Sequence, residues 1–76
     1  MIDIYELMEL AMQEMQNRLP KDCCTDDWQW NDTCFQFVII YADGRVSAPY
    51  RFCYDADEEW SGTGIEQLMG WLDARF

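Results

Sequence analysis

CFQFVIIY, residues 34–41, is the stretch that decides the fold. All of its residues except Gln36 are aromatic, β-branched or otherwise apolar, and no glycine or proline interrupts them. This composition is typical of a β-strand with a buried face. The following residues, Ala42-Asp43-Gly44-Arg45, predict a hairpin turn, because Gly44 can take a positive φ without steric cost.

The return strand is predicted over residues 46–54, and its register has two alternatives. A two-residue turn pairs Tyr41 with Val46 and collects a single apolar face from both strands: Phe35, Phe37, Ile39, Tyr41, Val46, Ala48, Tyr50 and Phe52. A type I turn with a bulge at Gly44 shifts the pairing by one residue and scatters this set over both faces. We favour the first register, because it produces one coherent core face.

Two other features of the hairpin are predicted, the first from this register and the second from a proline. Cys34 is expected opposite Cys53, on the face away from the aromatic set. Pro49 has no N–H to donate to a neighbouring strand, so the return strand is predicted to be an edge strand or to bulge at this residue.

An amphipathic helix is predicted on each side of the hairpin in sequence. Residues 3–19 form the first, with Asp3 as the N-cap and Pro20 as the stop signal. Its apolar stripe consists of Ile4, Leu7, Met8, Ala11, Met15 and Leu19. Thr63 opens the second helix, which extends to about Arg75. Its stripe consists of Ile65, Leu68, Met69, Leu72 and Phe76.

These elements predict a single α+β domain over residues 1–76, with the order α-β-β-α and both helices packed on one face of a small antiparallel sheet. Residues 21–33 are polar but contain Trp28 and Trp30 in alternation with Gln29, which permits a short strand. The sheet is therefore either a two-stranded hairpin or a three-stranded sheet.

Charge gives the strongest indication of function. Fifteen acidic residues against five basic residues leave a formal net charge of −10 on 76 residues. This exceeds the magnitude of roughly 2–8 that serves solubility in a small domain, and its self-repulsion opposes folding. The charge favours a strongly basic protein partner. It disfavours direct binding to nucleic acid or to an anionic membrane, because both would repel the chain.

The first ten residues, MIDIYELMEL, carry acids where a secretory signal has basic residues, and no apolar run reaches membrane-spanning length. We therefore expect a cytoplasmic protein. In that compartment all four cysteines, Cys23, Cys24, Cys34 and Cys53, should stay reduced.

Metal sites and cofactors are not expected. DADEEWSGTGIE, residues 55–66, spaces its oxygen-bearing side chains like a calcium-binding loop, but Trp60 stands where such a loop needs glycine. The cysteines form no C-x-x-C pair and the chain has no histidine, which disfavours zinc. Without histidine, and with a single lysine, the chain also lacks the usual general bases, so we expect no enzyme activity.

The candidate site is an acidic surface that binds a partner. One group of acids lies in the connection before the predicted hairpin and another follows it, and both connections can end opposite the Gly44 turn. The candidate residues are Asp26, Asp27, Asp32, Asp55, Asp57, Glu58 and Glu59, with Trp28, Trp30 and Trp60 among them. Aromatic anchors within charged surroundings are common in protein interfaces. The alternative is that the tryptophans belong to the core and the carboxylates are only solvated.

With acids in TDD and DADEE, tryptophans beside them and no histidine, the chain resembles the small acidic inhibitors of phages and mobile elements, including anti-CRISPR proteins and other DNA mimics. The resemblance covers size, charge and α/β build. It implies an inhibitor that presents carboxylates to the basic channel of a nucleic-acid-binding protein or complex, for example a CRISPR effector. For a phage-encoded protein the site of action would be the host cytoplasm.

Two alternative functions fit the same features. The first is an immunity protein or antitoxin for a basic toxin, which would use the same acidic surface on one cognate partner. The second is a homodimeric assembly adaptor, in which the strand at residues 46–54 pairs with a second copy by edge addition.

Overall fold

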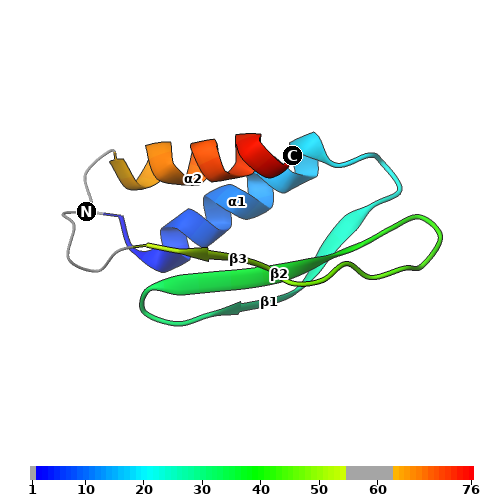
Figure 1. Cartoon of the computed structure of the whole chain (residues 1–76), viewed down its shortest axis with the longest axis horizontal. Helices are drawn as coiled ribbons and strands as arrows, with labels where there is room; N and C mark the ends of the chain where they lie inside the picture. Colours follow the sequence, from blue (N-terminus) through cyan, green and yellow to red (C-terminus); the bar gives the residue numbers. More distant parts are fainter. Residues whose placement is uncertain (1, 55–62) are drawn as a thin grey trace.

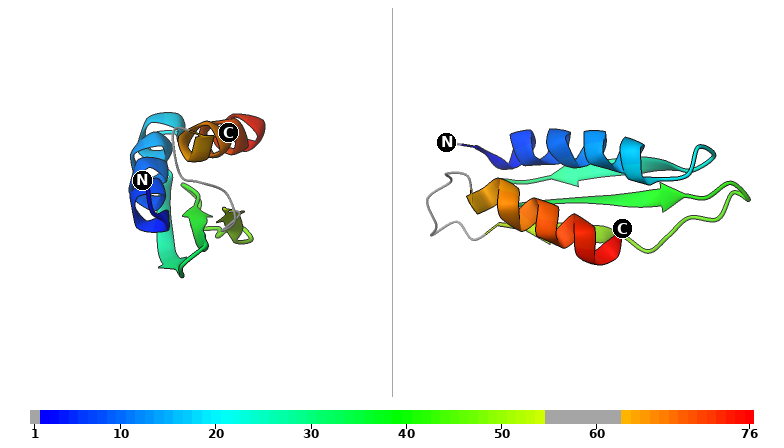
Figure 2. Two further views of the ribbon diagram at one scale, coloured as in Figure 1. Left: turned by 90° about the vertical axis from the view of Figure 1, so that its left-hand side faces the viewer. Right: turned by 90° about the horizontal axis from the view of Figure 1, so that it is seen from above.

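The computed structural model describes residues 2–54 and 63–76, and its elements follow the order α-β-β-β-α (Figure 1). They are α1 (Ile4–Arg18), β1 (Cys24–Trp30), β2 (Cys34–Ile40), β3 (Tyr50–Cys53) and α2 (Thr63–Arg75). The sheet is antiparallel with the strand order β1-β2-β3, and both helices lie on one of its faces (Figure 2). The predicted α+β architecture is confirmed, in its three-stranded form.

The ends of α1 are those that the sequence predicts. The Asp3 carboxylate accepts a hydrogen bond of 2.9 Å from the backbone N–H of Glu6, which satisfies one of the unpaired donors in the first turn. Leu19 has left the helix, with an extended backbone at ψ 147°. The physical reason is Pro20, which disfavours helical geometry in the residue before it. The buried face of α1 consists of Ile4, Leu7, Met8, Ala11 and Met15.

Helix α2 covers the rest of the sheet with Leu68, Leu72 and an aromatic residue outside the predicted stripe, Trp71. The indole of Trp71 makes edge-to-face contacts with Phe35 and Phe52, at ring centroid distances of 6.5 and 5.7 Å. Because Trp71 is three residues after Leu68, it lies beside the stripe and widens the buried face of the helix.

The hairpin of β2 and β3 combines both predicted registers. Along the strands, Phe35 pairs with Phe52 and Phe37 with Tyr50, as in the favoured register. At the turn, however, the N–H of Tyr41 donates to the carbonyl of Arg45 (2.8 Å). The N–H of Gly44 donates to the carbonyl of Tyr41 (2.9 Å), and Gly44 has φ +89°. This is the type I turn with a bulge at Gly44 that the second alternative describes.

The registers of the turn and of the strands differ by one residue, and the return segment accommodates this extra residue just before β3. Ser47 still follows the register of the turn, since its N–H donates to the carbonyl of Ile39 (2.8 Å), whereas Tyr50 follows the register of the strands. The extra residue therefore lies in the segment that contains Pro49, where the sequence predicted an edge strand or a bulge, and β3 is also an edge strand. As a result Val46 is 60% exposed and Ala48 is also exposed, so the prediction that these two residues belong to the core face is wrong.

Cys34 and Cys53 form a disulfide between β2 and β3. The N–H of Tyr54 donates to the carbonyl of Thr33 (2.8 Å), so the next pair along the strands, Cys34 and Cys53, is a non-hydrogen-bonded pair. In such pairs the two side chains approach closely. The prediction that all four cysteines are reduced is therefore wrong for this pair, because it considered the compartment and not the strand pairing. Cys23 and Cys24 are free thiols.

Candidate partner-binding surface

The sequence-predicted site residues divide into two groups. Asp55, Asp57, Glu58, Glu59 and Trp60 lie outside the described residues. The others belong to β1 and to the turn that follows it: Asp26, Asp27, Trp28, Trp30 and Asp32.

Trp28 is partly buried and packs against the core. Its ring stacks on Phe37 with centroids 4.4 Å apart, and its indole N–H donates to the hydroxyl of Thr25 (3.1 Å). The indole N–H of a tryptophan that is partly covered in this way usually has such a partner. Trp28 therefore contributes to the packing of the core and remains partly exposed.

Asp26 and Asp27 lie within β1, where a bulge interrupts the pairing with β2 between Asp26 and Gln29. Asp27 has φ 56°, a conformation that aspartate tolerates better than most residues. Because β1 is an edge strand, two exposed carboxylates and a bulge also protect it from pairing with another chain.

Asp32 is separated from these two acids along β1. Asp26 pairs with Val38, whereas Asp32 follows the end of the strand, in the turn whose backbone is held by Asn31. The neighbouring residue Thr33 accepts the backbone hydrogen bond of Tyr54, so Asp32 lies at the end of the sheet where β3 also ends. The structure therefore places Asp32, but neither Asp26 nor Asp27, at the end of the sheet opposite Gly44.

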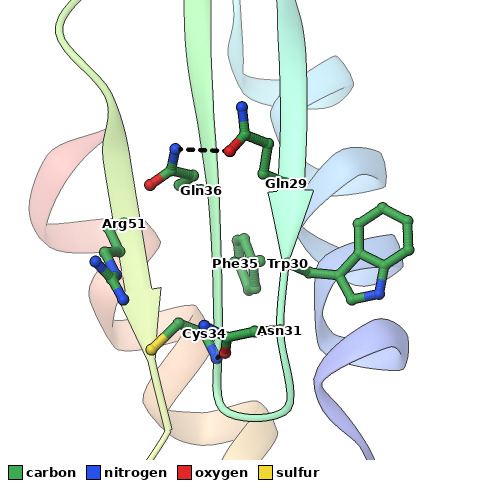
Figure 3. A pocket seen from close by; sticks show the side chains of 7 residues that line it. All are labelled: Gln29, Trp30, Asn31, Cys34, Phe35, Gln36 and Arg51. Atoms are coloured by element: carbon green, nitrogen blue, oxygen red, sulfur yellow. Dashed lines mark hydrogen bonds between the residues drawn. The ribbon is translucent and has the colours of Figure 1, made fainter.

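Two aromatic side chains form an exposed pair at this same end. Tyr5 of α1 and Trp30 of β1 contact each other edge-to-face, with ring centroids 5.6 Å apart, and their exposed fractions are 46% and 54%. Trp30 pairs with Phe35 and so shares the helix-covered face of the sheet. Because β1 is an edge strand, the indole of Trp30 extends past the sheet beside α1 (Figure 3).

Sequence reasoning identified Trp30 as a surface candidate but not Tyr5. The available signal was that Tyr5 is the single aromatic residue of the predicted helix 3–19 and stands off its apolar stripe. That pattern shows exposure, but it does not show which side chain of the sheet lies beside the ring.

Two acidic residues lie close in sequence to this aromatic pair. Glu9 lies one helical turn after Tyr5 on the same side of α1, and Asp32 comes two residues after Trp30. We call the surface formed by Tyr5, Glu9, Trp30 and Asp32 the α1–β1 edge. More generally, residues 2–32 contain eight acids and two bases, whereas residues 33–54 contain one acid and two bases. The negative charge of the described chain is thus concentrated on α1, β1 and their connections.

Three of the described basic side chains are engaged elsewhere. Arg18 forms ion pairs with Asp73 across the helix interface (2.7 Å) and with Glu14 of its own helix. The carboxylate of Asp73, and to a smaller extent that of Glu14, stabilises the guanidinium and raises the pKa of Arg18. Arg45 pairs with Asp43 (2.7 Å) at the hairpin turn. The guanidinium of Arg75 lies over Trp71. These cations therefore do not neutralise the carboxylates of the α1–β1 edge.

The uncovered face of the sheet carries a polar row across its three strands. Gln29, Gln36 and Arg51 are at the same register position, and the Gln36 amide donates to the Gln29 carbonyl oxygen (3.4 Å; Figure 3). They line a shallow hollow of about 140 Å³ together with Cys34 and Asn31. These two amides and the guanidinium offer hydrogen-bond donors and acceptors to a polar ligand.

Within residues 2–54 and 63–76, potential metal ligands form no group of three or more that could hold an ion. In the same part of the chain, neither helix combines the length and the apolar character needed to cross a membrane. Comparison of the chain with protein-family models, with curated proteins and with solved structures gives no match.

Proposed function

We propose that this chain is a small acidic binding protein that inhibits a nucleic-acid-binding partner by presenting carboxylates to the partner's basic surface. The observation that carries the proposal is the uneven charge distribution, with eight acids and two bases in residues 2–32. Four further acids, Asp55, Asp57, Glu58 and Glu59, lie outside the described residues and add to the same net charge.

The fold supports this proposal by holding the carboxylates on packed elements. Glu6 and Glu9 are exposed on α1, whose opposite face is buried against the sheet, so their spacing is set before any partner binds. Preorganised charges lose little conformational entropy on binding and steer a basic partner during encounter. The same carboxylates would compete with nucleic-acid phosphates for lysine and arginine side chains.

The structure offers less support for an adaptor that assembles by edge addition. The edge of β1 is interrupted by its bulge and carries Asp26 and Asp27, while β3 is only four residues long. Both features oppose pairing with a second copy. An immunity protein would use the same acidic surface, and the identity of the captured partner distinguishes it from a DNA mimic.

A test begins with tagged protein, nuclease-treated host lysate and washes of increasing salt, followed by purification of the retained partner. We expect this chain to displace nucleic acid from the purified partner and to lose affinity steeply as salt rises, because several ion pairs are screened together. Undiminished binding at high salt would contradict an electrostatic mode of recognition.

Two sets of charge variants locate the surface responsible. The double variant E6Q/E9Q and the reversal D57K/E58K should each weaken inhibition without unfolding the protein. E66Q is the control, because Glu66 is an exposed acid that belongs to α2 and to neither of the two varied regions. If both sets inhibit as well as the unmodified protein, neither acidic region acts as the proposed phosphate mimic.

A further inference from the structure

We propose that the Tyr5–Trp30 pair is an anchor that receives an arginine side chain of the partner protein. This inference rests on the proposed function and specifies the residue type that the acidic surface recognises. It concerns the aromatic rings of the α1–β1 edge, whereas the proposed function concerns the carboxylates.

Exposure of the two rings is the first argument. Tyr5, Trp30 and Val46 are the large apolar side chains that are well exposed among the described residues, and Val46 lies apart, beside the hairpin turn. Tyr5 and Trp30 contact each other, so their exposed surfaces form one continuous apolar patch. Tyrosine and tryptophan are enriched at the centres of protein interfaces because they bury a large area with few rotatable bonds.

The chain's own arginines provide the second argument. The guanidinium of Arg45 lies 5.8 Å from the ring centroid of Tyr41, and that of Arg75 lies 4.7 Å from the ring of Trp71. Each therefore lies over an aromatic ring at the distance of a cation–π interaction. No described cation takes this position over Tyr5 or Trp30, so the rings of the exposed pair remain open to a guanidinium from outside.

Charge complementarity is the third argument and selects the partner. Glu9 is one helical turn after Tyr5, Asp32 is two residues after Trp30, and both are exposed. Carboxylates on such a surface favour a cation over the neutral or anionic groups that also stack on indoles. Nucleic-acid bases stack on such rings as well, but their phosphates would be repelled here. Arginine suits the site better than lysine, since its planar guanidinium stacks on a ring while it donates hydrogen bonds to carboxylates.

Binding of hexa-arginine and hexa-lysine to the intact chain tests the inference, with the indole N–H resonances observed by NMR at low ionic strength. We expect hexa-arginine to bind roughly two- to fivefold more tightly than hexa-lysine, the ratio that one exposed cation–π contact supplies, and to shift the Trp30 resonance. Trp30→Ala should remove this preference and leave the affinity for hexa-lysine unchanged. Trp30→Leu keeps apolar volume without an aromatic face and should behave in the same way.

Val46→Ala is the matched control, because it truncates an exposed apolar side chain remote from the pair and should leave the arginine preference intact. If Trp30→Ala and Trp30→Leu both keep the preference, the anchor is refuted while the electrostatic function stands. If neither peptide binds the unmodified chain, the proposed acidic binding surface is refuted together with the anchor. The two outcomes therefore distinguish failure of the anchor alone from failure of the proposed function.

Discussion

Cys34 of β2 and Cys53 of β3 face each other with Cα atoms 4.1 Å apart, and their sulfurs form a disulfide. The bond closes a loop between residues 19 positions apart in sequence and secures β3, which has only four residues of its own. In the chain-entropy model, a loop of this size gives a disulfide a stabilising contribution of about 3 kcal/mol.

Removing this bond should therefore destabilise the domain. We expect the double variant C34A/C53A to lower the free energy of unfolding by about 3 kcal/mol, measured by urea titration. Reduction of the unmodified protein should have a similar effect, whereas C24S, at an exposed free thiol, should not. Equal urea midpoints for the oxidised and reduced protein would show that the bond does not stabilise the fold.

The two tryptophans of β1 should respond differently to truncation. Trp28 stacks on Phe37, so Trp28→Ala should lower the free energy of unfolding by about 2–4 kcal/mol through lost packing. Trp30→Ala should cost less than about 1 kcal/mol, because Trp30 is more than half exposed. Thermal unfolding of both variants measures the difference, and the reverse order would contradict their assignment to core and surface.

Two glycines should give stability changes of opposite sign when replaced by alanine. Gly44→Ala should destabilise by roughly 1–2 kcal/mol, because Gly44 has φ +89°, which a side chain disfavours even though nothing lies within 4 Å of the new Cβ. Gly70→Ala should stabilise by about 1 kcal/mol, because Gly70 is within α2, is exposed and has equally open surroundings. Denaturant unfolding of the two variants tests the turn and the helix independently.

The N-cap of α1 gives a fourth prediction. Asp3→Ala removes the acceptor of the Glu6 N–H and should lower the free energy of unfolding by about 1 kcal/mol, which corresponds to roughly 4–8 °C in Tm for a domain of this size. Asp3→Ser should retain most of the stability, because serine can accept the same bond. A Tm for Asp3→Ala equal to that of the unmodified protein would mean that the cap does not stabilise α1.

The sequence by itself determined the features that depend on residues close together in the chain. The start of α1 depends on Asp3 and its end on Pro20. The aromatic and β-branched residues of the apolar run 34–40 favour a buried strand. The hairpin turn at Gly44 is also local, because it requires a single residue that tolerates positive φ.

The tertiary structure decided the features that depend on residues far apart in the chain. β1 was left open by the sequence because an edge strand with a bulge has no regular alternation of apolar residues to reveal it. The hairpin register resulted from a competition in which the local geometry of Gly44 prevailed at the turn and the packing of Phe35 against Phe52 prevailed in the strands. The registers of the turn and of the strands differ by one residue, and this difference produced the irregular segment around Pro49.

The candidate site likewise has features that the sequence determined and features that only the tertiary structure decided. Composition alone revealed the acidic charge, since net charge does not depend on the fold. The tertiary structure was needed to show that Tyr5 contacts Trp30, because this contact depends on where α1 lies over the edge of the sheet. It was also needed to show that Trp28 stacks on Phe37 and does not join the exposed pair. Whether a tryptophan belongs to the core or to the surface is determined by which neighbours cover it, and those neighbours come from other elements of the chain.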